Sequence, residues 1–254
     1  MSVVERSPRR GTLWSGPTVV HARPLAHDPE AAFLIISGAH DENVSFPGPE
    51  IIDQWLATLA SWGYSRVRTS ALSLRPDQAL RAVGFTPVQD LVLMSMTHWT
   101  PPKFSLAPDI APKKALRWGK HLSSSLRDDI LRLDARAFGA TWALDPDAFA
   151  DALRATSRSQ VLVAQHKGVL QGFAVVGATS ATGYLQRLAV DADAQHSGVG
   201  SCLAAAAVQW ASRRGCRHTV VNTDVNNQTA QRLYEKIGFV VLPNRLTVLQ
   251  KELQ

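Results

Sequence analysis

The stretch Gln195-His196-Ser197-Gly198-Val199-Gly200 is the most informative part of this sequence. The apolar residues 184–190 before it predict a strand, and residues 199–214 after it carry apolar side chains at helical spacing. The first turn of a helix leaves N–H donors without partners and holds the positive end of the helix dipole. Glycine beside such a turn lets an anion approach the backbone. The stretch therefore predicts a phosphate-binding turn, although glycine before a helix also occurs as ordinary turn chemistry.

A second motif lies downstream, at Asn227-x-x-Ala230-x-x-Leu233-Tyr234-Glu235-Lys236-x-Gly238-Phe239. Together the two motifs resemble the GNAT superfamily of acyl-CoA N-acyltransferases. Gln195-x-x-Gly198-x-Gly200 matches the family's pyrophosphate loop, Gln/Arg-x-x-Gly-x-Gly/Ala, and Leu188-Ala189-Val190-Asp191 resembles the strand end that pairs with pantetheine. The second motif is similar to the family's helix that carries a tyrosine beside the thioester.

The resemblance covers residues 114–254, and within the family it is strongest to the ribosomal-protein alanine acetyltransferases. It implies an α/β GNAT fold, with a mixed, mostly antiparallel, twisted sheet flanked by helices. It also implies acetyl-CoA as co-substrate and a primary amine as acceptor. The pyrophosphate would bind the amides of residues 196–201, and the backbone of residues 188–190 would hold the pantetheine. The implied contact residues are Leu188, Ala189, Val190, Gln195, His196, Ser197, Gly198, Val199, Gly200, Ser201 and Asn227.

Tyr234 is the candidate general acid. It lies seven residues after Asn227, two helical turns, so the two side chains share a helix face. A phenol with a reference pKa of ~10 stays protonated at neutral pH and can donate to a departing thiolate. In an arbitrary helix, a tyrosine at this place would be a core residue. Asn227 has two interpretations, cofactor contact and helix N-cap, and Asn226 competes for the second.

The general base is not identified by the sequence. In the ribosomal-protein alanine acetyltransferases a glutamate lies five residues before the motif asparagine, and here that position is Asn222, which cannot act as a base. Asp224 has the same strand parity and is a substitute candidate, with a strand-end surface carboxylate as its other interpretation. His196 and His218 are interpreted as a loop residue and a strand residue, and a base acting through water is a further alternative.

A site without a strong base suits amines of low pKa. An α-amine has a reference pKa of ~7.7–8.0 and a lysine side chain one of ~10.4. The sequence therefore predicts acetyl transfer to a primary amine, either an α-amine of a peptide or protein or a small metabolite amine. The alternative is a non-catalytic acyl-CoA-binding regulatory module, which the glutamate-to-Asn222 departure favours.

Composition limits the remaining classes. The chain has 254 residues, 45% of them hydrophobic, and no apolar run reaches the ~18 residues of a membrane span. Its first residues lack the apolar core of a signal peptide, so a cytoplasmic location is expected. Cys202 and Cys216 show no metal-ligand spacing, so neither a metal site nor a disulfide framework is predicted.

The net charge of +6 is unevenly placed along the chain. Residues 1–113 hold 10 basic and 10 acidic side chains, and residues 114–254 hold 17 and 11. The basic residues are scattered and not interleaved with aromatics, which favours a polyanionic small ligand such as CoA over nucleic acid. No oligomeric state follows from the sequence.

The chain is predicted to have two parts. The proline-rich residues 100–112 are a linker candidate between a degenerate GNAT-like unit at 1–99 and a catalytic GNAT domain at 113–254. The first part echoes the second, because Gly63-Tyr64 aligns with Gly215-Cys216 and Gly84-Phe85 with Gly238-Phe239. It lacks the phosphate-loop pattern and has Leu80 where Tyr234 stands. A chance helix–strand similarity is the other interpretation.

The periodicity and the turn residues predict the elements of both parts. Helices are expected at residues 51–62, 123–138, 145–155, 199–214 and 228–237, and strands at 33–36, 91–94, 160–165, 169–176, 184–190, 218–223 and 246–249. In the first part, only the later portion of a GNAT unit is therefore expected.

Overall fold

The computed structural model describes residues 10–15, 18–36, 46–98, 112–115 and 122–253. The chain forms two compact units, one of residues 1–92 and 243–254 and the other of residues 93–242. The division falls inside strands β5 (Thr86–Thr97) and β11 (Val240–Glu252), so each unit contains part of both strands. The linker predicted at 100–112 lies, except for its last residue, outside the described residues.

The second unit is built on a mixed sheet with the strand order β5-β10-β9-β8-β7-β6. Its other strands are β6 (Lys113–Lys114), β7 (Arg158–His166), β8 (Val169–Ala178), β9 (Thr182–Val190) and β10 (His218–Asp224). The pairs β6–β7, β7–β8 and β8–β9 are antiparallel, and β10 runs parallel to β9. This confirms the predicted α/β fold with a mixed, mostly antiparallel sheet.

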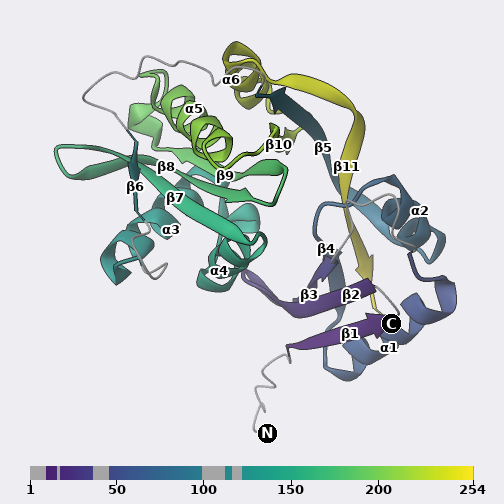
Figure 1. The fold of residues 1–254 in the computed structure, drawn as a ribbon. Coiled ribbons are helices and arrows are strands. Elements are labelled where there is room, and N and C mark those ends of the chain that lie inside the picture. The colour runs from purple at the N-terminus through teal and green to yellow at the C-terminus, as the bar shows by residue number, and fades with distance from the viewer. Residues whose placement is uncertain (1–9, 16–17, 37–45, 99–111, 116–121, 254) are drawn as a thin grey trace, which may run out of the picture. The chain divides into compact units, whose positions relative to one another are not determined.

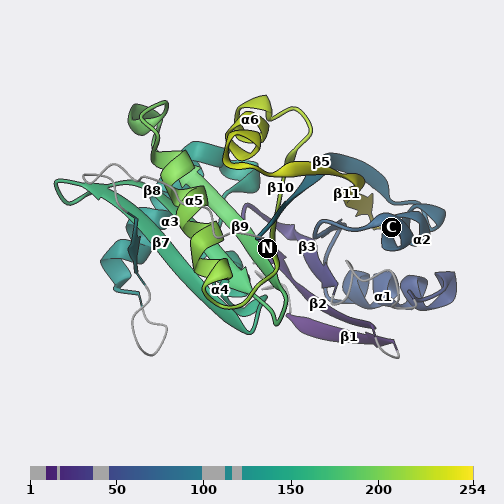
Figure 2. The same ribbon diagram turned by 45° about the horizontal axis from the view of Figure 1, so that its top comes forward.

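Helices cover both faces of this sheet (Figures 1 and 2). Helix α5 (Val199–Ser212) lies on one face, and α3 (Ser124–Phe138) and α4 (Pro146–Arg154) lie on the other. Strand β8 shows why both faces need cover. Its Ala174 and Val176 pack toward α5, whereas Phe173 and Val175 pack toward α3 and α4. A strand buried on both faces reads as a nearly continuous apolar run, as β8 does.

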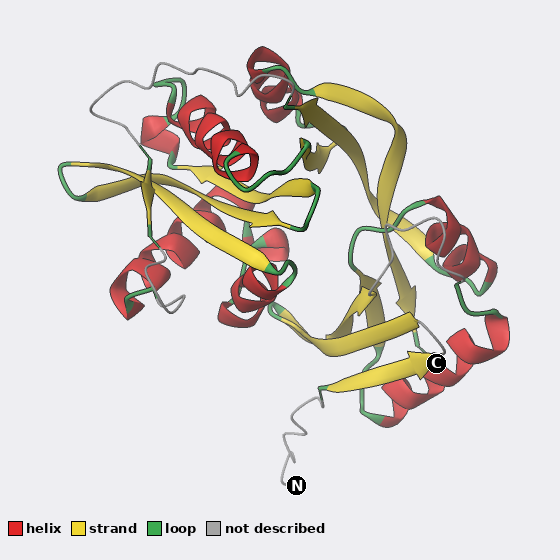
Figure 3. Ribbon diagram, viewed as in Figure 1, coloured by secondary structure: helices red, strands yellow, loops and turns green. Residues whose placement is uncertain are grey.

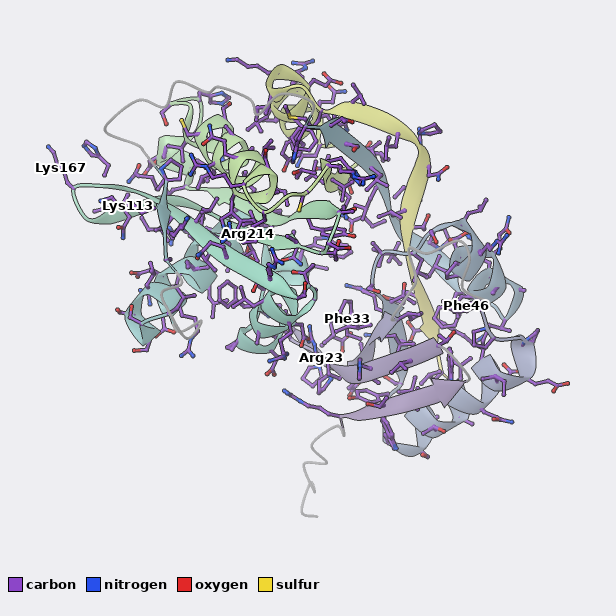
Figure 4. The ribbon with its side chains drawn as sticks, in the orientation of Figure 1. Arg23, Phe33, Phe46, Lys113, Lys167 and Arg214 are labelled. Carbon is purple, nitrogen blue, oxygen red and sulfur yellow. The ribbon has the colours of Figure 1, made fainter. Side chains whose placement is uncertain are left out.

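The first unit has the strand order β1-β2-β3-β4-β11-β5. Its elements are β1 (Gly11–Ser15), β2 (Thr18–Leu25), β3 (Asp28–Ile36), α1 (Pro49–Ser61), β4 (Arg66–Thr69) and α2 (Leu74–Ala82), with both helices shown red in Figure 3. Strands β1, β2 and β3 are antiparallel, and β3 is parallel to β4. On β2 the Arg23 guanidinium lies 5.0 Å from the centroid of the Phe33 ring (Figure 4).

The two units repeat one order of elements. The series β3-α1-β4-α2-β5 corresponds to β9-α5-β10-α6-β11, where α6 spans Gln228–Ile237, and in both series the first two strands are parallel. The glycines of the sequence echo follow α2 and α6 with φ of 90° at Gly84 and 111° at Gly238. Phe85 and Phe239 after them are both buried. Within the first unit, the hairpin β1–β2 precedes the elements that the sequence pattern indicated.

Candidate acyl-CoA site

Strands β9 and β10 separate before their ends. Their parallel pairing runs only from Thr182 opposite His218 to Leu185 opposite Val221. On its other edge, β9 stays paired with β8 as far as Val190. One edge of residues 188–190 therefore has backbone groups without a strand partner in this register. Such groups need another hydrogen-bonding partner, either water or a ligand.

A β-bulge marks the place of the separation. In the β8–β9 ladder Val176 faces Leu185 and Val175 faces Arg187, so Gln186 is the extra residue. A bulge bends its strand and increases the local twist. Because the bulge directly follows the last β9–β10 pair, it explains how β9 turns away from its parallel neighbour.

The loop after β9 brings the phosphate-turn motif to the start of α5. The short helix η3 (Ala192–Ala194) ends at Gln195, and the Ser197 hydroxyl donates to the Ala194 carbonyl at 2.6 Å. His196 has φ of 60° and Gly198, the N-cap of α5, has φ of 90°. A Cβ at Gly198 would meet nothing within 4 Å, so its backbone conformation is what favours glycine there.

Gly200 has a different role from Gly198. A Cβ at Gly200 would lie 2.7 Å from Leu233 Cδ1 and 3.4 Å from Val190 Cγ2. Its missing side chain therefore lets α6 and the end of β9 pack close to α5. The amides of Val199, Gly200 and Ser201 form the first turn of α5, where N–H groups have no carbonyl partner within the helix.

These elements enclose a cavity of about 560 Å³. Most of the predicted contact residues line it, namely Leu188, Ala189, Val190, Gln195, His196, Gly198, Gly200, Ser201 and Asn227. Ser197 and Val199 do not line it, and Val199 is buried in the core beneath α5. Asn222, Asp224 and Tyr234 also lie outside the lining.

Other lining residues were not predicted from the sequence. Phe138 ends α3, and Arg232 and Lys236 lie one turn apart on α6. The i, i+4 spacing of Arg232 and Lys236 within the second motif was the signal that could have identified them. No carboxylate is among the lining residues in the described part of the chain. The cavity is therefore electropositive, with two cations and a helix N-terminus directed at it.

Asn227 both caps helix α6 and lines the cavity, so it has both of the positions that the sequence left open. Its side-chain oxygen accepts from the Ala230 amide at 3.0 Å, so it caps α6, and it also lines the cavity. Asn226 is not the cap, because the N-cap position directly before α6 is Asn227; the backbone N–H of Asn226 donates to Asp224 Oδ1 at 2.8 Å. The Asp224 carboxylate thus closes the turn between β10 and α6, and the Asn222 side chain is exposed. The structure does not bring either residue to the cavity.

Tyr234 lies in the core of the second unit. Its side chain is only 5% exposed, and its ring centroid is 5.6 Å from that of Phe239. Burial raises the pKa of the phenol above its ordinary value, so the group is protonated at neutral pH. Leu80, at the matching place in α2 of the first unit, is also buried.

A buried ion pair fixes the α3–α4 side of the site. Asp134, which is 0% exposed, accepts two hydrogen bonds of 2.7 Å from Arg187 and one of 2.7 Å from the Leu144 amide. Arg187 also donates to the Trp142 carbonyl at 2.7 Å. Its guanidinium lies 3.4 Å from the centroid of the Phe138 ring, which lines the cavity. The pair therefore connects the β9 bulge to the cavity wall and to the segment before α4.

The fold and the cavity define an α/β protein with an electropositive cavity between β9, α5 and α6. Residues 127–239 match the family model described as the acetyltransferase (GNAT) family, and this part of the chain is a GNAT acetyltransferase domain. Among the described residues, no helix is long and apolar enough to cross a membrane and no cluster of side chains suits a metal ion.

Known proteins resemble the chain in part of its sequence or in its fold. Human N-alpha-acetyltransferase 30 is 36% identical over 58 residues, which are 23% of this chain and 16% of that protein. A GCN5-related N-acetyltransferase from Sphaerobacter thermophilus has a TM-score of 0.58 at 17% identity, covering 93% of this chain and 77% of its own. A tandem GNAT protein from the clavulanic acid biosynthesis pathway has a TM-score of 0.65 at 12% identity. The match covers 93% of this chain and 79% of that protein's chain. The two structural likenesses show the fold alone.

Proposed function

We propose that the chain is an N-acetyltransferase that moves an acetyl group from acetyl-CoA to a primary amine. The observation that carries the proposal is the electropositive cavity between the separated end of β9, the N-terminus of α5 and the face of α6. Its volume of about 560 Å³ falls in the range typical of ligand pockets. We place the reaction in the half at residues 113–254, because the half at 1–99 lacks the phosphate-loop sequence.

The residues present fit acetyl-CoA. The first-turn amides of α5 suit its pyrophosphate, and Arg232 and Lys236 add positive charge for its phosphates. The unpaired edge of residues 188–190 suits the amide groups of a pantetheine arm. When bound, acetyl-CoA supplies the activated acyl group as a thioester.

The proposed chemistry needs a polarised carbonyl and two proton transfers. Backbone N–H groups at Leu188 and Val190 would stabilise negative charge on the carbonyl oxygen. Tyr234 holds a proton at its phenol oxygen, and we assign it the protonation of the leaving sulfur. No carboxylate of the described residues lines the cavity, so the acceptor has to arrive largely uncharged.

That requirement favours an α-amine of a peptide or protein, or a small amine of low pKa. About a quarter of an α-amine is neutral near pH ~7.4, against ~0.1% of a lysine side chain. The lysine would add about 4 kcal/mol to the barrier unless the site lowers its pKa.

A second candidate is an acyl-CoA-binding module without catalysis. The positions of the three catalytic candidates favour it, because none of them lines the cavity. Tyr234 is buried, Asn222 is exposed, and Asp224 closes the turn before α6. Both candidates require the same cavity, so binding of acetyl-CoA alone does not separate them.

The test measures binding and turnover separately. Calorimetry gives the acetyl-CoA affinity, and chromatography of liberated CoA gives the rate with peptides that offer either a free α-amine or only a lysine side chain. Gly198→Val should weaken acetyl-CoA binding roughly tenfold, about 1.4 kcal/mol, because valine disfavours the positive φ of the turn. Tyr234→Phe should keep the affinity and lower turnover by about ten- to a hundredfold.

Each outcome selects a candidate. Tight acetyl-CoA binding without CoA release on any amine supports the binding module. Turnover that prefers lysine side chains near neutral pH contradicts the weak-base site. Unchanged affinity in folded Gly198→Val contradicts the cavity assignment itself.

A further inference from the structure

Four arginines meet at the end of the second unit's strands where β7 begins. Arg158 starts β7 and pairs with Ala178, the last residue of β8. The turn that follows β8 contacts the chain between α5 and β10, because the Arg217 amide donates to the Ala181 carbonyl at 2.7 Å. Arg213 and Arg214 follow the C-terminus of α5. We call Arg158, Arg213, Arg214 and Arg217 the arginine patch.

The arginine patch differs from most other arginines of this unit in having no acidic partner, although Arg232 on α6 contacts only the Gln228 amide among the described residues. Five arginines elsewhere in the unit form ion pairs, namely Arg127–Asp128, Arg132–Asp129, Arg136–Asp191, Arg154–Asp151 and Arg187–Asp134. No arginine of the patch forms an ion pair with any described residue. The sequence has no Asp or Glu at residues 152–190 or 194–223, two stretches that include this end of the sheet.

The uncompensated charge is unfavourable in the free protein. Arg158, Arg213 and Arg217 are exposed, and Arg214 lies 3.8 Å from the centroid of the Trp210 ring, to whose carbonyl it donates at 3.2 Å. Partial burial and then the charge of Arg158 lower the pKa of Arg214. Like charges gathered without counter-charges repel each other, and an anionic ligand removes that repulsion.

The patch is separate from the acyl-CoA cavity. The cavity lies at the N-terminus of α5 and the patch at its C-terminus, and a helix of 14 residues is about 21 Å long at ~1.5 Å per residue. Figure 4 places Arg214 in this unit, away from Lys167 in the turn at the other end of β7 and β8. A ligand on the patch would therefore leave the cavity free.

The side chains around the arginine patch indicate which class of anionic partner fits it best: a protein, a membrane or a phosphate backbone. Trp210, on which Arg214 stacks, is 3% exposed, and the exposed large apolar side chains of the described residues lie elsewhere, at Leu74, Val88, Val169, Val240 and Val241. A protein interface would need an apolar or aromatic centre, and an anchored membrane contact would need apolar side chains to insert. Planar guanidinium forks without apolar surroundings suit phosphate oxygens.

We propose that the arginine patch binds the phosphate backbone of a nucleic acid, independently of base sequence. In the sequence, Arg158 lies far from Arg213, Arg214 and Arg217. The sequence alone therefore did not predict that these arginines form one surface. The pairing of β7 with β8 and the turn after β8 bring them together.

The test uses the full chain and fluorescence anisotropy with a labelled 20-nucleotide single-stranded RNA and the DNA of the same sequence. Four phosphate contacts predict a slope of log K against log salt concentration near −3, at ~0.7 per contact. Arg158→Gln/Arg213→Gln/Arg217→Gln should reduce the slope to about −1 and weaken binding at least tenfold in ~50 mM salt. Arg214 is kept because it packs on Trp210.

The control removes the same charge from paired arginines. Arg127→Gln/Arg132→Gln/Arg154→Gln should change RNA affinity about twofold or less, and both triple variants should bind acetyl-CoA as the unaltered protein does. The proposal is overturned if the unaltered protein binds neither probe, if both triple variants lose affinity equally, or if saturating acetyl-CoA displaces the RNA. Displacement by polyglutamate as effective as by unlabelled RNA would assign the patch to an acidic protein instead. A difference between the RNA and DNA probes would show which backbone it prefers.

Discussion

Replacing Arg187 with methionine tests how the site is held together. The change removes both 2.7 Å hydrogen bonds to Asp134, the bond to the Trp142 carbonyl and the cation stacked on Phe138. Asp134 is 0% exposed, and among the residues that the structure describes it keeps the Leu144 amide as its one remaining donor. Breaking a buried pair by removing one partner costs about 3–5 kcal/mol, because the remaining charge stays buried without compensation.

The expected loss is large enough to measure in the full chain. For chains of 150–250 residues, 1 kcal/mol shifts the unfolding midpoint by about 2–4 °C, so Arg187→Met should lower it by about 6–20 °C. Thermal unfolding followed by circular dichroism gives the midpoint. Acetyl-CoA affinity should fall as well, because Phe138 loses the guanidinium that holds it in the cavity wall.

Two further variants separate the ion pair from other effects. Asp134→Leu/Arg187→Met removes both charges and should recover most of the lost stability, since an apolar pair can replace a buried ion pair at little cost. Arg154→Met breaks an exposed pair with Asp151 and should cost at most about 1 kcal/mol. If Arg187→Met costs no more than Arg154→Met, or if the double variant is as unstable as the single one, the reasoning is refuted.

Three other expectations concern the cavity and one histidine. Gly200→Ala should leave stability within about 2 kcal/mol, because alanine's helix preference offsets overpacking, yet weaken acetyl-CoA binding roughly tenfold in calorimetry by pushing Leu233 into the cavity. Arg232→Gln/Lys236→Gln should raise the acetyl-CoA Kd and flatten its dependence on salt, and an unchanged salt dependence would contradict their contact with phosphates. Burial lowers the pKa of His98, so the unfolded chain takes up the proton first and stability should fall as pH drops below ~6.5. In His98→Gln, the melting temperature should fall less between neutral and acidic pH than in the unaltered protein. An identical fall in both proteins would exclude His98 as its cause.

The helices of the second half were predictable because single capping residues mark where a helix begins and ends. Asn227 caps α6 and Gly238 ends it, and the observed helix has the predicted bounds. Strand β11 shows the opposite case. Only residues 246–249 were predicted, but the strand runs from Val240 to Glu252. Pro243 and Asn244 resemble turn residues in the sequence, and the strand nevertheless continues through them.

The parts of the site that depend on pairing between distant segments could not be predicted. The Gln186 bulge and the early end of the β9–β10 ladder arise from the register of three strands, which no local pattern specifies. The Arg187–Asp134 pair likewise joins residues from a strand and a helix far apart in the sequence. By contrast, the turn at Gly198 depends on local sequence, and Gly198 lines the cavity; its binding of phosphate stays a prediction.

The repeat offers an independent argument about Tyr234. Leu80 and Tyr234 occupy matching places, four residues before a glycine with positive φ, and both side chains are buried. Packing at this position therefore requires only an apolar side chain, as the first unit shows. Phenylalanine would supply the same buried ring without the polar hydroxyl, so packing alone does not account for the hydroxyl. We infer that the hydroxyl in the second unit serves proton transfer. Tyr234→Phe should then lose turnover without losing stability, whereas a loss of stability alone would place the phenol in the core and favour the binding module.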